Sequence, residues 1–379
     1  MTSHEELTRW RRHLHAHPEF GFEETETSAF VEARLREFGF DEIATGVGGT
    51  GVVATLRAGS SNRAIAFRAD MDALRIEEAG DPDWKSTNPG VMHACGHDGH
   101  TTMLLGAASA LAASRDFDGV IHFIFQPAEE WGKGMLAMLD DGLLERFPHE
   151  EAYGLHNMPG IPVGHFETRT GAFMGAEDNF RIDFKGMGGH ASRPHELQDA
   201  IVAASAAVMS LQTVVSRAVD PSQLAAVSVT EFLTDGTRNA IAGGTTLLGD
   251  CRNFDPTVSE RIEAAMRRIA EGVGAAHGCE VSFEYTREFV PLINDAEATS
   301  HALAAAEAVA PGKVKADAAP IGASEDFARL TNLVPGNFIN MGNGDTATLH
   351  NAAYDFNDEA IPFGVDYFTT LARTRLPAG

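Results

Sequence analysis

The sequence predicts an α/β protein with a mostly parallel mixed sheet flanked by helices, into which a smaller α+β domain is inserted. Short apolar runs alternate with helical segments in the first part of the chain and again near its C-terminus. Strands separated by helices form parallel sheets covered on both faces. The middle of the chain pairs long helices with strands of alternating polarity, and 379 residues are too many for one ordinary core. We therefore expect a discontinuous domain over 1–177 and 290–379 and an inserted domain over 178–289.

The first elements are two helices followed by strands. Glu5 to His17 predicts a helix that Pro18 ends, and Glu24 to Phe38 predicts a second helix that ends at Gly39. Runs rich in branched and aromatic side chains predict strands at Val52–Leu56, Ala64–Phe67 and Val120–Phe125. The alanine-rich segment Thr101–Ala113 predicts a buried helix before the third of these strands.

The insert has its own set of elements. Two helices are predicted at Leu197–Val219 and Thr257–His277. Strands are predicted at Asn179–Phe184, Leu224–Phe232, Thr245–Asp250 and Glu280–Tyr285. We expect these strands to form a small antiparallel sheet under the two helices. The α/β pattern resumes near Asp295 and closes with a helix from Glu359 to about Arg373.

Composition excludes several classes of partner. The formal net charge is −25, which repels phosphate backbones, so nucleic acid is not expected as a partner. No apolar run reaches the length of a membrane span, and the first residues lack the apolar core of a signal peptide, so we expect a cytoplasmic protein that binds no membrane. The three cysteines, Cys95, Cys251 and Cys279, are too few for a disulfide framework.

The segment from Met92 to His100 concentrates groups that bind metals. It reads MHACGHDGH and is too polar for a core. Cys95 and His97 bring a thiolate and an imidazole together, and both are good ligands for zinc or similar ions. A catalytic cysteine with a histidine base, or a set of capping and surface histidines, would use the same residue types.

Other polar residues follow predicted strands. Glu129 and Glu130 follow Val120–Phe125 after three residues, and on an extended chain one would face a metal and the other a substrate. An acidic loop is the alternative. His156 and His350 each follow a short apolar run and extend the set of candidate ligands.

Two further segments have a candidate role around such a site. Asp72, in RADMDAL, follows a strand and could orient a ligand histidine, although a turn would also use an aspartate there. His190, in the glycine-rich GMGGHAS, could donate a hydrogen bond to a developing oxyanion, or simply lie in an exposed turn.

Taken together, these segments resemble the metallopeptidase-like amidohydrolases, the family of hippurate hydrolases, bacterial N-acyl-amino-acid aminoacylases and plant indole-acetyl-amino-acid hydrolases. The resemblance runs from RRHLHAHPEFGFEE through RADMDAL, HACGHDGHT, FQPAEE, GLHNMP, GGHASRPH and SEDFA to LHN. It implies a zinc-peptidase-like catalytic domain with an inserted dimerisation or lid domain, and hence a homodimer. The implied activity is hydrolysis of the amide bond of acetyl, benzoyl, indole-acetyl or similar amino acids, which releases a carboxylic acid and a free amino acid.

The resemblance also implies roles for individual residues. It implies two divalent metal ions per subunit, Mn²⁺ or Zn²⁺ ahead of Co²⁺ or Ni²⁺. The implied ligands are Cys95, which bridges, and His97, Glu130, His156 and His350. Glu129 is the implied general base and acid, and Asp72 orients a ligand. His190 and Asn239 resemble oxyanion and substrate-carboxylate groups, and Arg252 has a similar implied role.

The chain departs from the family pattern in the insert. The stretch after Asn239 reads AIAGG where the family has an apolar, proline-containing stretch, and the next strand ends in DCRNF. These changes spare the metal ligands and bear on Asn239, Arg252 and the substrate. The alternative activity of the same fold is that of a dipeptidase. A hydrolase that uses Cys95 as its nucleophile and a non-catalytic binding protein are the alternatives outside it.

Overall fold

The computed structural model describes residues 2–40 and 42–379, and the chain forms two compact units. Unit 1 comprises Met1–Phe173, Ile293–Ala319 and Glu325–Gly379. Unit 2 comprises Met174–Leu292 together with the short segment Pro320–Ser324. The sequence pattern could not reveal that this distant segment packs with unit 2, because five residues carry no periodic signal.

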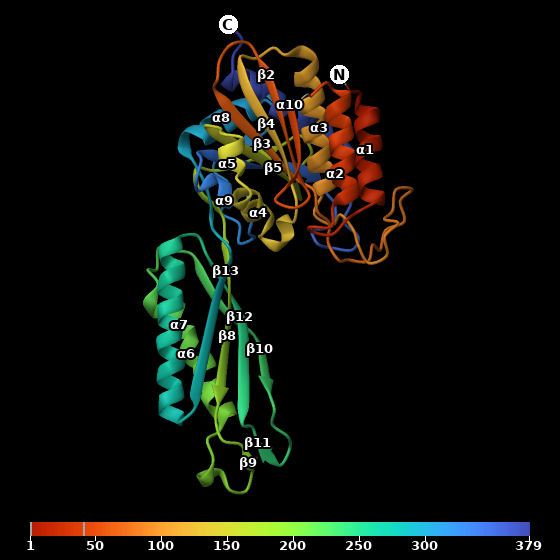
Figure 1. The fold of residues 1–379 in the computed structure, drawn as a ribbon. Helices are drawn as coiled ribbons and strands as arrows, with labels where there is room; N and C mark the ends of the chain where they lie inside the picture. Colours follow the sequence, from red (N-terminus) through yellow and green to blue (C-terminus); the bar gives the residue numbers. More distant parts are fainter. Residues whose placement is uncertain (1, 41) are drawn as a thin grey trace. The chain divides into compact units, whose positions relative to one another are not determined.

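Unit 1 contains an eight-stranded sheet in the order β1-β2-β4-β3-β5-β16-β6-β15 (Figure 1). The strands are β1 Glu42–Val47, β2 Gly51–Ala58, β3 Ala64–Asp70, β4 Gly119–Gln126, β5 Glu151–Pro159, β6 Phe166–Glu167, β15 Val314–Lys315 and β16 Gly336–Gly344. The four central strands β4, β3, β5 and β16 pair in parallel. Antiparallel pairs join β1 to β2, β2 to β4 and β16 to β6. The predicted mixed α/β class is confirmed.

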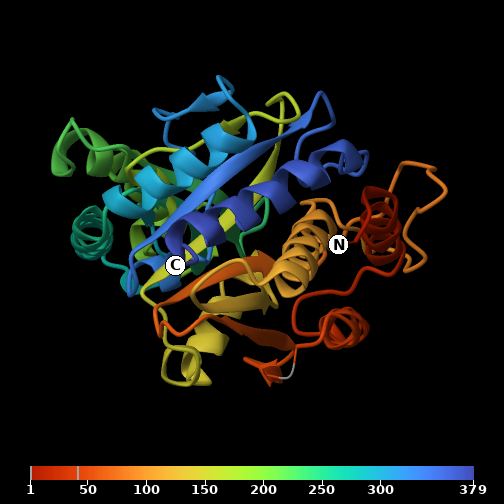
Figure 2. The ribbon, with the colours of Figure 1, turned by 90° about the horizontal axis from the view of Figure 1, so that it is seen from above.

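Helices cover this sheet. They are α1 His4–Ala16, α2 Thr25–Glu37, α3 His97–Ser114, α4 Gly134–Asp140, α5 Leu143–Arg146, α8 Ala296–Val309, α9 Ala328–Thr331 and α10 Ile361–Arg375. The dark-blue α10 packs between α3 and α8 (Figure 2). Alternate residues of β3 face different helices, as strand geometry requires. The ring of Phe67 lies 5.1 Å from that of Phe368 in α10, whereas the guanidinium of Arg68 lies 5.6 Å from the ring of Phe327 beside α9.

Unit 2 is an antiparallel four-stranded sheet with two helices packed on it. Its strands, in the order β10-β12-β8-β13, are Ala225–Thr234, Gly244–Asn253, Ala176–Lys185 and Glu280–Phe289. The helices are α6 Ala200–Thr213, which continues as a π-helical turn Val214–Ala218, and α7 Pro256–His277. A short pair is formed by β9 Gly189–His190 with β11 Ala240–Ile241. A second short pair, β7 Gly171–Met174 with β14 Leu292–Asn294, lies mostly in unit 1.

One helical stretch of unit 2, Ala200–Ala218, is long and apolar enough to cross a membrane by length and composition alone. Its buried residues in α6 are Ala200, Ala203, Ala204, Ala207 and Leu211. This spacing of three and four residues is that of a helix with one face on a domain core. Ile201, Val202 and Met209 lie on its exposed side, and Met209 is 72% exposed. The helix is therefore a domain helix with a second apolar face that remains uncovered in the single chain.

Candidate metal centre

The five predicted ligands come from four segments of unit 1. Cys95 precedes α3 and His97 is its first residue, whereas His156 lies within β5. Glu130 lies in a 3₁₀ turn, Glu129–Trp131, that follows β4. His350 lies in a turn beyond β16 and has a backbone φ of +61°. The carboxyl ends of β3, β4 and β5 are where α/β proteins collect functional groups.

Two of the local predictions were wrong in detail. Glu129 and Glu130 are not on an extended chain, because Ala128 has a φ of +47° and turns the backbone directly into the 3₁₀ helix. His350 is not at the end of a strand, since β16 already ends at Gly344. Its backbone N–H donates instead to the carbonyl of Ala94, at 2.8 Å, which ties the C-terminal loop to the loop that carries Cys95.

The ligand atoms form two groups of three that share one member. In the first group, atoms of Cys95, His97 and His156 all lie within 4.8 Å of one another. In the second, the same holds for Cys95, Glu130 and His350. A shared thiolate between two sets of nitrogen and oxygen donors is the arrangement that a bridging ligand requires. The donor groups are close enough together to hold divalent metal ions.

His97 is oriented for metal binding. Its Nδ1 lies 2.9 Å from the carbonyl oxygen of Asp72 and 3.2 Å from the Oδ1 of Asp72, so Nδ1 carries the proton. Its Nε2 is buried and has no hydrogen-bond partner among the described residues. Burial disfavours the charged ring, but the carboxylates of Asp70, Asp72 and Glu130 outweigh it and raise the pKa of His97 to about 10. A cation is therefore favoured where Nε2 points.

The other donors leave atoms free in the same way. The Oε1 of Glu130 is buried without a hydrogen bond in the described part of the chain, although His350 Nε2 approaches it to 3.2 Å. Cys95 Sγ lies 3.4 Å from His156 Nε2. Burial and then the charges of Glu130, Glu129 and Asp70 raise the pKa of the Cys95 thiol well above its usual range. Without a cation this thiol stays protonated, so the donors fit a metal pair better than they fit a free thiolate nucleophile.

His100 belongs to the same cluster but cannot be a ligand in this arrangement. Asp70, His97 and His100 form another group of donor atoms within 4.8 Å. However, His100 Nδ1 lies 2.6 Å from Asp70 Oδ1, and His100 Nε2 accepts the backbone N–H of Asn157 at 2.9 Å. Both ring nitrogens are therefore occupied. His100 instead holds the carboxylate of Asp70 beside His97 Nε2.

Glu129 lies beside the ligands and has a different environment from Glu130. It is buried, and its Oε2 lies 4.0 Å from His97 Nε2. Burial first, and then the negative charges of Glu325, Glu130 and Asp326, raise the pKa of Glu129 well above its usual range. The pKa of Glu130 is lowered, because contacts with His350 and His97 outweigh the effect of burial. The two neighbouring carboxyls thus favour opposite protonation states.

A buried cluster of charged residues that the sequence pattern did not indicate supports Glu129. Its centre is Arg68, whose guanidinium donates to Gln126, Asp70, Glu325 and Asp326 over distances of 2.7 to 3.1 Å. The backbone N–H of Asp326 points to Glu129 Oε1 at 3.4 Å. Arg68 lies in the motif RADMDAL, and Glu325 and Asp326 lie in SEDFA. A single sequence does not show that this arginine pairs with carboxylates more than 250 positions away.

The predicted substrate-binding residues of the insert fall at opposite ends of unit 2. His190 pairs with Ala240, and the N–H of Ala191 donates to Asn239, so His190 and Asn239 lie together. Arg252 lies at the other end of β12 and bonds Glu177, Asp250 and Ser324. Strands rise about 3.3 Å per residue, so roughly 25 Å separates the two ends. The Nδ1 of His190 accepts the N–H of Ser192, which leaves Nε2 as the donor of the neutral ring.

Comparison with known proteins gives a family match. The model of peptidase family M20/M25/M40 matches residues 66–374. A hippurate hydrolase from Campylobacter jejuni is 37% identical over 97% of this chain and 96% of its own length. An N-acyl-L-amino acid amidohydrolase from Geobacillus stearothermophilus is 40% identical over 75% of this chain and 77% of its own.

A solved structure extends this comparison to the fold. The crystal structure of a Bacillus subtilis dinuclear metal binding peptidase from the M20 family superposes with a TM-score of 0.86 at 33% identity. The match covers 99% of each chain. It spans both the split sheet domain and the inserted α+β domain. This chain belongs to peptidase family M20/M25/M40.

Proposed function

We propose that this protein is a metal-dependent amidohydrolase that cleaves N-acyl amino acids into a carboxylic acid and a free amino acid. The observation that carries the proposal is the pair of three-donor groups that share Cys95, with the buried carboxyl of Glu129 beside them. The names of the relatives from Campylobacter and Geobacillus support the substrate class. A dipeptidase of the same fold is the alternative to be tested beside it.

Two divalent ions would be held by Cys95, His97, Glu130, His156 and His350. The set mixes a thiolate, imidazoles and a carboxylate, which suits Zn²⁺ and also Mn²⁺, with Co²⁺ and Ni²⁺ as further candidates. Asp72 would keep the Nδ1 proton of His97 in place and leave Nε2 as the ligand atom. Bound at this position, the ions would supply Lewis acidity and lower the pKa of water from ~15.7 towards ~7.

Glu129 is the residue we propose as general base and then general acid. Its position 4.0 Å from His97 Nε2 puts a carboxyl within reach of the metal ligands without making it one of them. Burial and the surrounding carboxylates raise its pKa, which favours the protonated form that a general acid needs. Glu129 would take a proton from water as water attacks the amide carbon, and would pass it to the departing amine.

We further propose that the protein is a homodimer in which the insert of one subunit completes the site of the other. The exposed apolar side chains Val202, Met209, Leu224 and Phe232 lie on α6, on β10 or next to β10, the edge strand of unit 2. An apolar helix face beside an unpaired strand edge is a surface that soluble proteins cover. It is also an explanation of the apolar Ala200–Ala218 stretch that needs no membrane.

The layout of unit 2 supports sharing between subunits. The chain enters unit 2 at Met174 and leaves it at Leu292, at the end of the sheet that carries Arg252. His190 and Asn239 lie at the opposite end, roughly 25 Å along the strands. In the dimer, His190 and Asn239 of the partner subunit would contact the oxyanion and the substrate carboxylate. Arg252 would also bind the substrate. We expect the enzyme to work in the cytoplasm.

A substrate and metal screen tests the proposed function. Purified protein is stripped with chelator, reloaded with Mn²⁺, Zn²⁺, Co²⁺ or Ni²⁺, and assayed on acetyl, benzoyl, indole-acetyl and long-chain acyl amino acids and on dipeptides. We expect activity to vanish on chelation, to return with metal and to favour an N-acyl amino acid. Activity that survives complete chelation would identify Cys95 as a nucleophile, and a preference for dipeptides would select the alternative.

Metal content gives a second test that does not depend on the substrate. Cys95→Ser and His350→Ala change residues that are 255 positions apart, yet both belong to one donor group. Both variants should lose metal after dialysis, as measured by elemental analysis. A loss in Cys95→Ser larger than one ion per subunit would agree with a bridging role. Full occupancy in either variant would remove that residue from the ligand set.

A further inference from the structure

The motif HPEFGFEE, residues 17–24, lies outside the proposed ligands yet contacts the loops beside them. The backbone N–H of Ala73 donates to the carbonyl of Glu19 at 2.8 Å, and Phe20 forms a bridge with Ala73. Ala73 directly follows Asp72, which orients His97. The segment therefore lies against the loop that contains Asp72, the residue that orients the proposed ligand His97.

Glu24, at the end of this motif, contacts the second loop. Its side chain is completely buried. Oε1 accepts the backbone N–H of Ala128 at 2.8 Å, and Oε2 accepts the hydroxyl of Thr50 at 2.5 Å. Ala128 immediately precedes Glu129 and Glu130. A single carboxylate thus links the start of α2, the turn before β2 and the turn that carries both functional glutamates.

The turn at Ala128 needs such support. With a φ of +47°, Ala128 adopts a left-handed conformation that costs a non-glycine residue about 1 kcal/mol or more. This conformation reverses the chain between β4 and the 3₁₀ turn and so sets the directions of Glu129 and Glu130. Gly21 leaves room for it, because a Cβ at position 21 would lie 3.1 Å from both Cα and Cβ of Ala128.

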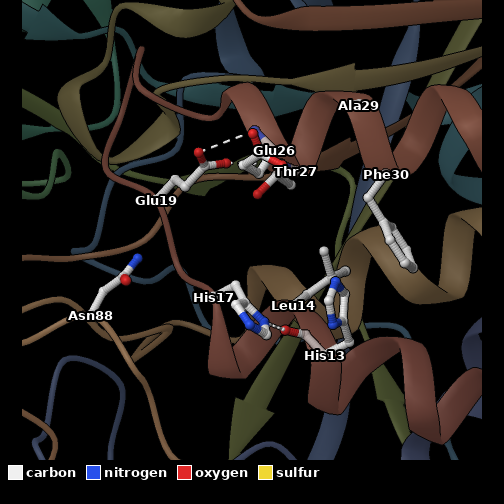
Figure 3. Close-up of a pocket in the computed structure, with 9 residues that line it drawn as sticks. All are labelled: His13, Leu14, His17, Glu19, Glu26, Thr27, Ala29, Phe30 and Asn88. Carbon is white, nitrogen blue, oxygen red and sulfur yellow. Dashed lines mark hydrogen bonds between the residues drawn. The ribbon is translucent and has the colours of Figure 1, made fainter.

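The motif itself is held in a fixed position. The carboxylate of Glu19 accepts the backbone N–H groups of Glu26 and Thr27 (Figure 3). It also accepts the hydroxyl of Thr25, and so caps the start of α2. The ring of Phe20 lies 5.0 Å from that of Trp131, at the end of the 3₁₀ turn. Glu24 is therefore presented from a capped helix terminus and not from a loose loop.

We propose that Glu24 is a positioning residue that holds Ala128 in its left-handed conformation and thereby places Glu129 and Glu130 for the reaction. The proposal rests on the proposed function. Partners that orient the groups around a metal typically change metal affinity or activity by 10–100-fold when they are removed. Glu24 acts through hydrogen bonds to a backbone N–H and to a hydroxyl. A glutamine can keep both, with its carbonyl oxygen on Ala128 and its amide N–H on the Thr50 oxygen.

The test compares Glu24→Ala and Glu24→Gln with the matched control Glu23→Ala. Glu23 precedes Glu24 but is 68% exposed, with only a 3.9 Å ion pair to Arg75. For each metal-loaded protein, kcat, KM, affinity for Mn²⁺ and Tm are measured. We expect Glu24→Ala to lower kcat by about 10–100-fold with little change in KM, and to weaken Mn²⁺ binding through Glu130. Glu24→Gln and Glu23→Ala should stay within about threefold of the wild type.

The possible outcomes separate the explanations. Wild-type kcat and Mn²⁺ affinity in folded Glu24→Ala would overturn the proposal and leave Glu24 a merely structural residue, even if Tm falls. An equal loss in Glu24→Gln would also overturn it, since the hydrogen bonds would then not be what matters. If Glu24→Ala does not fold, Glu24→Gln and Thr50→Val, which replaces the hydroxyl by a methyl group, are compared by the same readouts. A wild type that binds Mn²⁺ but hydrolyses no acyl amino acid would contradict the proposed function, while the Mn²⁺ affinities would still test the positioning.

Discussion

Two neighbouring carboxyls at the site differ because their surroundings differ. Glu130 faces His350 and His97, and these contacts lower its pKa although it is buried. Glu129 faces Glu325 and Asp326, and their charges add to burial and raise its pKa. A pair of acids whose pKa values are driven apart is a sign that one binds or stays ionised while the other exchanges protons.

This difference predicts distinct effects of two matched substitutions. Glu129→Gln should keep its metal and lose about 10²–10⁴-fold in kcat, the usual contribution of a general base. Glu130→Gln should lose metal, because it removes a charged donor from the group with Cys95 and His350. Elemental analysis and steady-state kinetics on both variants check this. Wild-type kcat in metal-loaded Glu129→Gln would show that Glu129 is not the general base.

At this scale the sequence could indicate donors but not their geometry. Cys95, His97, Glu129 and Glu130 stood out because polar groups interrupt apolar segments there. The positive φ of Ala128 could not be predicted, since no glycine or asparagine marks it. The same is true of Arg68, whose partners Glu325 and Asp326 come from the far end of the chain. Local patterns record composition and spacing, whereas these features depend on which loops meet.

Among the elements, α1 and α3 are joined by a buried ion pair. His15 of α1 lies with its Nδ1 2.8 Å from Asp98 Oδ2, at the start of α3, and its Nε2 3.4 Å from Glu78 Oε1. Burial disfavours the charged ring, but these two carboxylates raise the pKa of His15 to about 9.

The predicted helix at Thr101–Ala113 starts four residues too late, because His97, Asp98 and His100 look like loop residues until their buried partners are known.

The raised pKa of His15 predicts how stability depends on pH. A group whose pKa is raised by folding stabilises the protein fully below its ordinary pKa of about 6.5, and this stabilisation is lost as the pH rises through about 9. The loss should amount to at most about 3 kcal/mol in the free energy of unfolding. Denaturant unfolding of chelator-treated protein between pH 6 and 9.5 measures it. His15→Gln should be less stable at pH 6 and should lack this fall, and parallel curves for the two proteins would contradict the assignment.

For the whole molecule, the alternation of strands and helices was enough to predict the fold class, and the structure confirms it. The alternation of strands and helices could not predict that Pro320–Ser324 packs with unit 2. The separation of His190 and Asn239 from Arg252 was equally hidden, because it depends on the register of β12 with β8. This separation makes the sharing of sites between subunits a testable property of the assembly.

Complementation in mixed dimers tests whether two subunits share each site. If each site combines Glu129 of one subunit with His190 of its partner, then Glu129→Gln and His190→Ala dimers should each be nearly inactive. A mixed dimer would have one site with both changes and one site with neither. Random mixing makes half of the dimers mixed, so about a quarter of all sites should recover full activity. Co-expression with two affinity tags isolates the mixed dimers, and each pure variant serves as a control. If both residues act within one chain, every site keeps one change, and verified mixed dimers stay inactive.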